Sequence, residues 1–303
     1  MILFSRNIED PPQLARLVAS LRAILPPLAV LMVDQEGGRV ARLRPPHWRA
    51  HPPAAALGLL YASAPEAGLR AAWLTGALIG LECAAAGFDI VTAPVLDLFF
   101  PGAHSVVGDR AFSAEPRTVA RLGRALASGL LASGVQPVMK HIPGHGRALL
   151  DSHLALPRVE SARLAADLLP FLFNAGLPWA MTAHILYPCW DAERPATLSE
   201  TIIRRIVRGR VGFAGVLVTD DLAMEALAGP PASRAAAALA AGADLALYCA
   251  GEAAANEAVL EAAPELPGEA VTRLERARAM AASARLPLDA ASLGPERERL
   301  LGA

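Results

Sequence analysis

Short runs of Val, Ile and Leu alternate with longer Ala-, Leu- and Arg-rich stretches, and this alternation constrains the fold more than any other feature of the sequence. The short runs have the length of buried strands, and the longer stretches carry apolar residues at helical spacing. Repetition of this kind is typical of βα units, in which helices cover a parallel sheet. The predicted strands are residues 2–4, 28–33, 88–93, 135–139, 179–182, 215–219 and 244–249.

Helical patterns fill the stretches between these strands, and no Ser/Gly-rich linker divides the chain. The predicted helices are residues 67–86, 116–133, 161–174, 199–209, 232–241 and 269–284. The Pro-rich patch at residues 45–53 is expected to be an extended loop after a strand. Hydrophobic residues make up 54% of the chain, which suits one large core. We therefore predict a single domain over residues 1–303, an α/β fold of the TIM-like (β/α)8 barrel type with a truncated first strand.

Charge and composition restrict the partners. The net charge is −1, without the excess of basic residues that binds nucleic acid or anionic membranes. No signal-peptide pattern opens the chain, and no apolar stretch reaches the roughly 18 residues of a membrane span. Cys83, Cys189 and Cys249 are odd in number and lie among apolar residues, as in a reducing compartment. We expect a small-molecule partner, no nucleic acid, no membrane and a cytoplasmic location, while protein partners stay unknown.

Polar side chains follow the predicted strands directly, at Asp34, Lys140, His141, His184, Asp220 and Asp221. The carboxyl ends of barrel strands converge on one face, where the active sites of such barrels are built. Residues far apart in the sequence are therefore predicted to meet in one pocket.

Lys140 is the only lysine among the 28 basic residues of the chain. An ammonium is a compact cation and a guanidinium a flat fork, so a lone lysine indicates a position where arginine does not fit. An ordinary surface lysine is the alternative interpretation.

The segment from Asp34 to Arg42 reads Asp-Gln-Glu-Gly-Gly-Arg-Val-Ala-Arg. Its paired glycines permit a tight turn, after which Arg42 can return to the pocket beside Asp34. A carboxylate there can accept hydrogen bonds from sugar hydroxyls. The alternative is a glycine turn with solvated charges.

The segment from Lys140 to His153 holds three of the seven histidines. Pro143, Gly144 and Gly146 prevent regular structure, which predicts a specially shaped loop. Asp151 lies two residues from His153 and can orient its imidazole, as a general acid/base pair requires. The alternative is a metal site, because the side chains that could ligate a first-row metal are His141, His145, Asp151 and His153.

Asp220 directly follows an apolar strand, which would hold its carboxylate rigidly at the floor of the pocket, as a nucleophile requires. Asp221 is better suited to capping the following helix. Arg110 follows the third strand and could bind a sugar hydroxyl or an acyl carbonyl. Alternatively, it pairs with Asp109 on the surface.

Together these segments resemble the family 3 glycoside hydrolases, in particular the single-domain β-N-acetylglucosaminidases of bacterial cell-wall recycling. The Lys-His-x-Pro-Gly-His-Gly motif with its later Asp-Ser-His is specific to that branch. The resemblance covers most of the chain in order, at residues 4–7, 34–42, 93–97, 108–113, 140–146, 151–153, 182–184, 195–199 and 219–224. Family members usually begin upstream of the first strand, so either the true start precedes Met1 or the barrel closes imperfectly.

The resemblance implies roles for these residues. Asp220 would be the nucleophile of a retaining mechanism and His153, assisted by Asp151, the acid/base, with no metal or other cofactor. The sugar-binding set would be Asp34, Arg42, Arg110, Lys140 and His141. The implied activity is exo-acting β-N-acetylhexosaminidase, and the implied substrate is a GlcNAc–anhydroMurNAc muropeptide. Two alternatives stay open: a metal-dependent hydrolase on the same barrel, and a sugar-binding remnant without catalysis.

Overall fold

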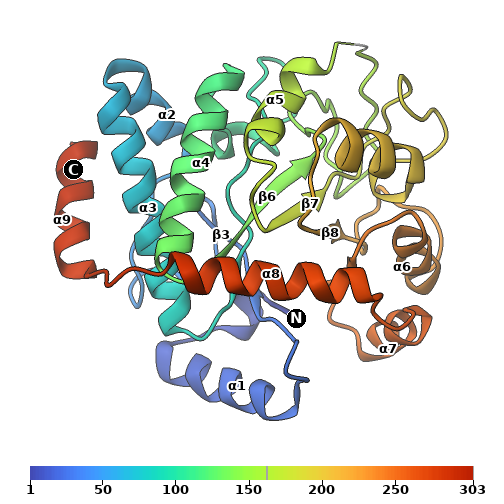
Figure 1. Cartoon of the computed structure of the whole chain (residues 1–303), viewed down its shortest axis with the longest axis horizontal. Coiled ribbons are helices and arrows are strands. Elements are labelled where there is room, and N and C mark those ends of the chain that lie inside the picture. The colour runs from blue at the N-terminus through green and yellow to red at the C-terminus, as the bar shows by residue number, and fades with distance from the viewer. Residues whose placement is uncertain (162, 303) are drawn as a thin grey trace.

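The computed structural model describes residues 1–161 and 163–302, and it shows a curled parallel sheet surrounded by helices (Figure 1). The strand order β1-β2-β5-β6-β7-β8-β9 follows the chain, and every neighbouring pair in this sheet is parallel. These strands are β1 (Ile2–Leu3), β2 (Met32–Val33), β5 (Ile90–Val91), β6 (Gln136–Ile142), β7 (Trp179–Thr182), β8 (Val216–Asp221) and β9 (Leu245–Leu247). The predicted barrel-type fold and all seven predicted strands are confirmed, and the first strand is a stub of two residues.

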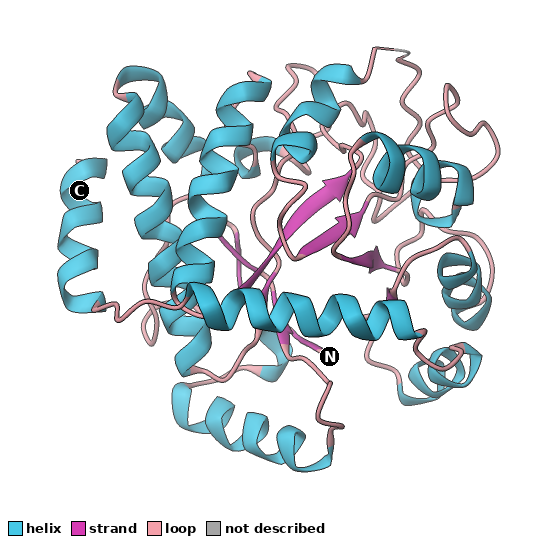
Figure 2. Ribbon diagram, in the orientation of Figure 1, coloured by secondary structure: helices cyan, strands magenta, loops and turns pink. Residues whose placement is uncertain are grey.

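Helices cover the outer face of the sheet (Figure 2). They are α1 (Pro11–Ile24), α2 (Ala54–Ser63), α3 (Pro65–Ala85), α4 (Pro116–Ala132), α5 (Ala165–Phe173), α6 (Pro231–Ala240), α7 (Ala253–Ala262), α8 (Gly268–Ala284) and α9 (Ala290–Leu301), with a π-helix η4 (Ile202–Arg210) and the 3-10 turns η1 (Ser5–Asn7), η2 (Gly108–Arg110) and η3 (Ala196–Leu198). None of the helices in the described ranges is long and apolar enough to cross a membrane.

Alternate residues of each strand face opposite sides of the sheet, because side chains alternate along a pleated strand. Those facing inward form an apolar cluster that includes Met32, Val138, Met181 and Val218. Helix α8 adds Leu274 and Ala277 to this cluster. The Arg278 guanidinium on the same helix donates to the carbonyl oxygens of Pro27 and Ala29, just before β2. Helix α8 therefore closes the end of the barrel where the strands begin.

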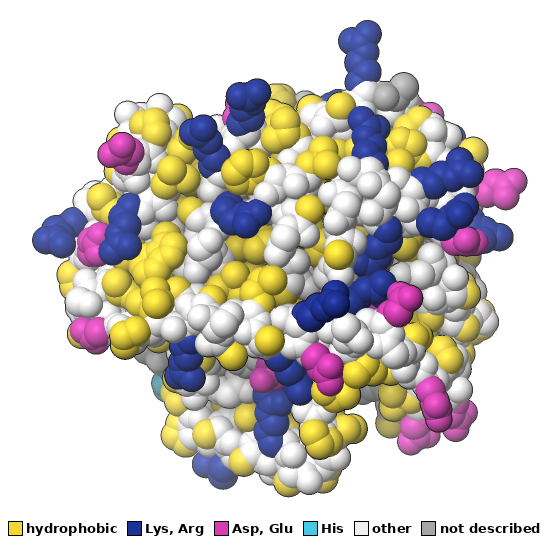
Figure 3. Space-filling model, viewed as in Figure 1, with side chains coloured by type: hydrophobic (Ala, Val, Ile, Leu, Met, Phe, Trp, Pro, Cys, Tyr) yellow, Lys and Arg dark blue, Asp and Glu magenta, His cyan; other side chains and the backbone are white. Residues whose placement is uncertain are grey.

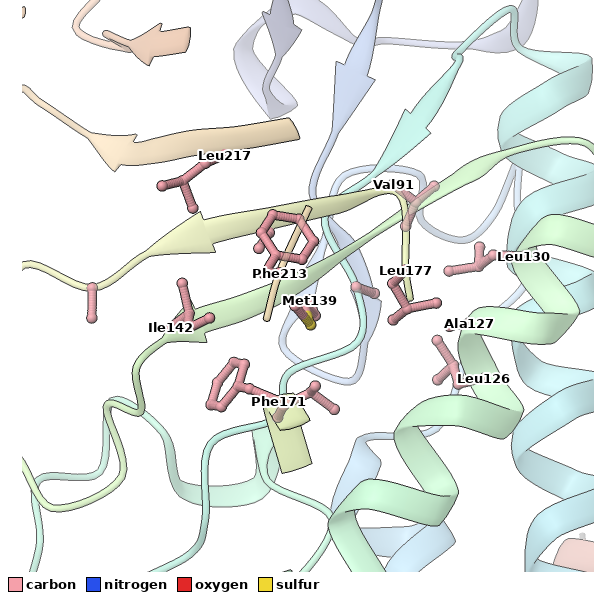
Figure 4. Close-up of a cluster of buried hydrophobic side chains, with 14 of the residues drawn as sticks. Val91, Leu126, Ala127, Leu130, Met139, Ile142, Phe171, Leu177, Phe213 and Leu217 are labelled. Carbon is pink, nitrogen blue, oxygen red and sulfur yellow. The ribbon is translucent and has the colours of Figure 1, made fainter. Parts of the chain in front are cut away.

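The residues facing outward form the larger core between sheet and helices (Figure 4). Val91, Met139 and Leu217 project from three strands, and Leu126 and Leu130 of α4 are part of the same cluster. Burying a side chain of this size contributes roughly 1.5–3 kcal/mol relative to leaving it in water. The strands are thus apolar on both faces, which explains why they appear in the sequence as continuous apolar runs.

Several elements differ from the sequence prediction. Helices α1, α2, α7 and α9 were not predicted, nor was the antiparallel hairpin of β3 (Gln35–Gly37) and β4 (Val40–Ala41). The helix predicted at residues 161–174 is shorter, beginning at Ala165, and its residue 162 lies outside the described residues, as does residue 303 of the predicted domain. The helix predicted at residues 199–209 is a π-helix. The Pro-rich patch at residues 45–53 is a loop, as predicted.

Basic side chains are spread over the face shown in Figure 3, with acidic side chains among them. The whole chain carries a net charge of −1.

Candidate active site

A cavity of about 460 Å³ opens where the strands end. This volume is within the range of small-ligand sites. All eight residues predicted for the site line this one cavity: Asp34, Arg42, Arg110, Lys140, His141, Asp151, His153 and Asp220. The structure thus brings together side chains that are up to 186 positions apart in the sequence (220 − 34).

The strands explain why three of these side chains point into the cavity. Asp34, Lys140 and Asp220 each lie two residues beyond an inward-facing apolar residue of the same strand or its extension. The pleat repeats every two residues, so these three side chains occupy the next inward position. The floor below them is apolar, since Met181 and Leu247 also line the cavity.

Asp34 is surrounded by donors. Its Oδ2 accepts a hydrogen bond from Arg42 Nη2 at 2.7 Å, its Oδ1 accepts one from the Thr92 hydroxyl, and Lys140 Nζ lies 3.5 Å from Oδ1. Burial raises the pKa of this carboxyl, but the charges of Lys140 and Arg42 outweigh burial and hold the pKa well below its usual range. Asp34 is therefore a carboxylate with remaining capacity to accept hydrogen bonds.

Glu36 connects two of the cations that line the cavity, Arg110 and Lys140. Its carboxylate accepts hydrogen bonds from Arg110 Nε and Nη2, both at 2.8 Å, and contacts Lys140 Nζ at 2.5 Å. Burial raises its pKa, but Arg110 and Lys140 more than offset this and lower the pKa to about 2. The alternative pairing of Arg110 with Asp109 is wrong, because Asp109 pairs with Arg39. Lys140 is buried, so it is not an ordinary surface lysine.

Asp97 organises the histidine loop from below. This fully buried carboxylate accepts a hydrogen bond from His141 Nδ1 at 2.6 Å and another from the His145 backbone N–H at 2.6 Å. Burial raises the pKa of Asp97, whereas the charge and the hydrogen bond of His141 lower it to a value below the usual range. The His141 ring is therefore oriented with Nδ1 toward Asp97 and Nε2 toward the cavity.

Asp220 lies at the floor, opposite this histidine. Its Oδ2 is 3.9 Å from His141 Nε2, and its Oδ1 accepts the Asp221 backbone N–H at 2.9 Å. Burial raises the pKa of Asp220, but His141, His184 and the backbone N–H together lower it. The result is an ionised, fixed carboxylate with a small exposed area, 14% of its side chain, facing the cavity.

Two polar residues at the strand ends, Asp221 and His184, hold the neighbouring backbone through hydrogen bonds. Asp221 Oδ1 accepts the backbone N–H groups of Ala223 and Cys249, both at 2.9 Å, and so joins the turn after β8 to the end of β9. The prediction that Asp221 caps the following helix is wrong, because a turn follows β8 and the next helix, α6, begins only at Pro231. His184 is fully buried and lies outside the cavity lining; its Nε2 donates to the Asp221 carbonyl oxygen at 2.9 Å, and its Nδ1 lies 2.7 Å from the Thr197 hydroxyl.

Asp151 and His153 lie on the long loop between β6 and α5. His153 Nδ1 donates to Asp151 Oδ1 at 2.7 Å, and the His153 backbone N–H donates to the same oxygen at 2.9 Å. The imidazole is 57% exposed, and both residues line the cavity. This arrangement leaves His153 Nε2 available for proton exchange with a bound molecule.

The sequence prediction did not assign Glu36, Asp97 or Thr92 to the site, and it considered His145 only as a ligand in the metal alternative. The sequence did contain a signal for Asp97 and Glu36, because both are polar residues that lie just beyond predicted strands.

Among the residues that the structure describes, no three His, Cys, Asp or Glu side chains form a group that could hold a metal ion. Of the four side chains of the metal alternative, His141 binds Asp97, His145 contacts Ser152, and Asp151 and His153 bind each other.

A parallel barrel with a fixed carboxylate at its floor and a carboxylate-oriented imidazole on a loop above it holds two kinds of group, an ionised carboxylate and a proton donor, that the chemistry of a glycoside hydrolase uses. Residues 1–282 match the model of the glycosyl hydrolase family 3 N-terminal domain, and the chain belongs to this family.

Similar proteins agree with this assignment. The chain is 41% identical over 283 residues to a protein named beta-hexosaminidase from Thiobacillus denitrificans, covering 91% of this chain and 78% of that protein. A beta-hexosaminidase from Nitrosospira multiformis is 40% identical over 285 residues, 92% of this chain and 81% of the relative. The crystal structure of NagZ from Neisseria gonorrhoeae in complex with N-trifluoroacetyl-D-glucosamine has a TM-score of 0.86 and 33% identity, covering 99% of this chain and 89% of that one.

Proposed function

We propose that this glycoside hydrolase is an exo-acting, retaining β-N-acetylhexosaminidase that removes terminal N-acetylglucosamine. The observation that carries the proposal is the ionised Asp220 at the floor of the same cavity that the Asp151–His153 pair lines. The names of the curated relatives support the activity, and the bound N-trifluoroacetyl-D-glucosamine of the Neisseria gonorrhoeae structure supports the sugar.

In the first step, an Asp220 carboxylate oxygen attacks the anomeric carbon while His153 Nε2 donates a proton to the departing oxygen. The glycosidic bond breaks and a glycosyl ester forms on Asp220. In the second step, the now neutral imidazole takes a proton from water, whose oxygen attacks the same carbon and releases Asp220. Two displacements at one carbon return the original anomer. A neutral imidazole does not repel the carboxylate that leaves in the second step.

The remaining lining residues hold the sugar. Asp34 accepts hydrogen bonds from sugar hydroxyls, and Arg42 and Lys140 keep it ionised. His141, which Asp97 orients toward Asp220, donates from Nε2 to a hydroxyl near the reacting carbon. Arg110 is fixed by Glu36 at the cavity wall, where its guanidinium is available to an acyl carbonyl or a hydroxyl.

A more specific proposal concerns the natural substrate and the compartment in which it is turned over. The muropeptide GlcNAc–anhydroMurNAc presents a terminal N-acetylglucosamine of the required kind, and turnover of this disaccharide would serve cell-wall recycling in the cytoplasm. The three cysteines are free, which agrees with a reducing compartment. We further propose that residues 1–303 work as one catalytic domain without a metal.

The direct experiment compares two aryl glycosides that differ only at carbon 2. We expect turnover of the aryl β-N-acetylglucosaminide at least about 100-fold faster, in kcat/KM, than turnover of the aryl β-glucoside, because polar groups placed for the acetamido group are left unpaired with glucose. Activity that persists in a chelator supports the metal-free mechanism over a metal-dependent hydrolase. Absence of turnover with binding of N-acetylglucosamine would identify a sugar-binding remnant instead.

A further inference from the structure

The segment at residues 149–154 carries the proposed acid/base, and Ser152 is its one buried residue. Leu149, Leu150 and Leu154 are each more than half exposed, as is the side chain of His153. Large apolar side chains that stay in water do not fix a loop, because they gain nothing from burial in this position. The placement of His153 over the cavity therefore depends on what Ser152 contacts.

Ser152 contacts two loops that belong to the site. Its Oγ lies 3.2 Å from His145 Nε2 and 3.8 Å from Met224 Sδ, and its carbonyl oxygen accepts the Ala226 backbone N–H at 3.2 Å. His145 follows β6, whereas Met224 and Ala226 follow β8, the strand that carries Asp220. One small side chain thus links the acid/base segment to the loop bearing the nucleophile.

His145 is itself fixed. Its backbone N–H donates to Asp97 at 2.6 Å, its ring packs edge-on against His141 with centroids 5.6 Å apart, and it is 3% exposed. Burial and the neighbouring His141 lower its pKa to about 4, so the ring is neutral at the pH where the enzyme would work. Asp97 therefore orients the His141 ring, whose Nε2 is directed toward Asp220, and anchors the backbone of His145, whose Nε2 is directed toward Ser152.

We propose that Ser152 is a positioning residue that holds His153 over the glycosidic oxygen through its contact with His145. This inference rests on the proposed role of His153 as acid/base. Ser152 touches no reacting atom, and its effect is on the fraction of molecules in which the Asp151–His153 pair is in place. Loss of the Oγ contact lowers that fraction and leaves the sugar-binding side chains of the barrel unchanged.

The test is the Ser152→Ala substitution, which keeps the backbone bond to Ala226 and removes the hydroxyl. The measurement is kcat/KM for aryl N-acetylglucosaminides whose leaving groups span a range of pKa. We expect a loss of roughly threefold to tenfold for the poorest leaving groups, the size of one hydrogen bond, and no loss for the best, which need no proton. The affinity for N-acetylglucosamine itself stays unchanged.

The Ser133→Ala substitution is the matched control. Ser133 is as buried as Ser152, at the end of α4, and its Oγ donates to the Leu130 carbonyl at 2.7 Å. We expect this variant to change the melting temperature and to leave the leaving-group dependence of kcat/KM as in the parent. An equal loss across all leaving groups in Ser152→Ala would mean general damage and would overturn the positioning role.

The His153→Ala background separates the two proposals. If His153 is the acid, its removal steepens the leaving-group dependence, and Ser152→Ala then adds no further loss. A further loss of the same size in that background would overturn the inference and leave the acid/base assignment standing. If His153→Ala does not steepen the dependence, the acid/base assignment fails and the inference fails with it.

Discussion

The Asp220 carboxylate is the side chain on which the proposed chemistry depends. The Asp220→Asn substitution changes its size very little and replaces the attacking oxygen with a neutral amide that cannot form a glycosyl ester. We expect kcat for an aryl N-acetylglucosaminide to fall on the order of 10⁴-fold, with little change in melting temperature.

The neighbouring Asp221→Asn variant is the control for this change. Asp221 supports the turn after β8 through two backbone hydrogen bonds, which the carbonyl oxygen of asparagine can also accept. The expected loss in kcat is below about tenfold, the scale of one weakened hydrogen bond. Equal losses at both positions would show that Asp220 has no special role.

A substitution at Lys140 tests whether this position, the only lysine of the chain, requires an ammonium group. Its Nζ contacts Thr92, Asp34 and Glu36 in a buried position that leaves 3% of the side chain exposed. In Lys140→Arg the charge is kept, but a flat guanidinium must fit where a compact ammonium lies. We expect KM to rise about tenfold or more, whereas the surface change Arg121→Lys has no effect. An unchanged kcat/KM would make the lysine an accident of composition.

Among the elements, the contact between α3 and α4 depends on glycine. A Cβ at Gly76 would lie 2.0 Å from the Leu126 carbonyl oxygen, which belongs to the helix backbone and cannot move aside alone. Alanine is otherwise the better helix former by about 1 kcal/mol, so propensity and packing act in opposite directions here. We expect Gly76→Ala to lower the free energy of unfolding by about 1–3 kcal/mol, because the helices must separate.

Urea unfolding monitored by circular dichroism measures this effect. Gly268→Ala is the control, since a Cβ at Gly268 in the first turn of α8 would meet no atom within 4 Å. That variant should be neutral or more stable than the parent. A stabilised Gly76→Ala variant would contradict the close packing of these two helices.

The elements also show what a sequence can and cannot predict. The strands were found because both of their faces are buried, which leaves continuous apolar runs. Helix α7 was not found because Val259 is its only buried residue, and α1 buries only Leu14 and Val18, so neither has a wide apolar stripe. Asp34, Lys140 and Asp220 were predicted from their place at strand ends. Glu36 forms an ion pair with Arg110, which is 74 positions away, and a local sequence pattern contains no information about such a pairing.

At the scale of the whole molecule, three buried histidines predict a dependence of stability on pH. Burial is the largest cause that lowers the pKa of His51, His145 and His184. Their folded-state pKa values lie below the unfolded value of roughly 6.5. The unfolded chain therefore binds more protons below pH 6.5, and stability is lost as the pH falls through this value toward 4.

We expect the melting temperature to fall continuously from pH 7 to pH 5, with proton uptake on unfolding at pH 5. Calorimetry in buffers of different ionisation enthalpy measures this uptake. A melting temperature that is constant over this range would contradict the burial of these three imidazoles in neutral form.

The central claim, that Asp220 becomes glycosylated while His153 transfers the protons, can be tested on one sample. In His153→Ala, a substrate with a very good leaving group still glycosylates Asp220, but water lacks its general base, so the ester accumulates. Mass spectrometry of the quenched, digested protein should find one N-acetylhexosaminyl residue on the peptide that contains Asp220. The same variant carrying Asp220→Asn should show none. An unmodified Asp220 peptide, or a sugar attached to another residue, would contradict the account.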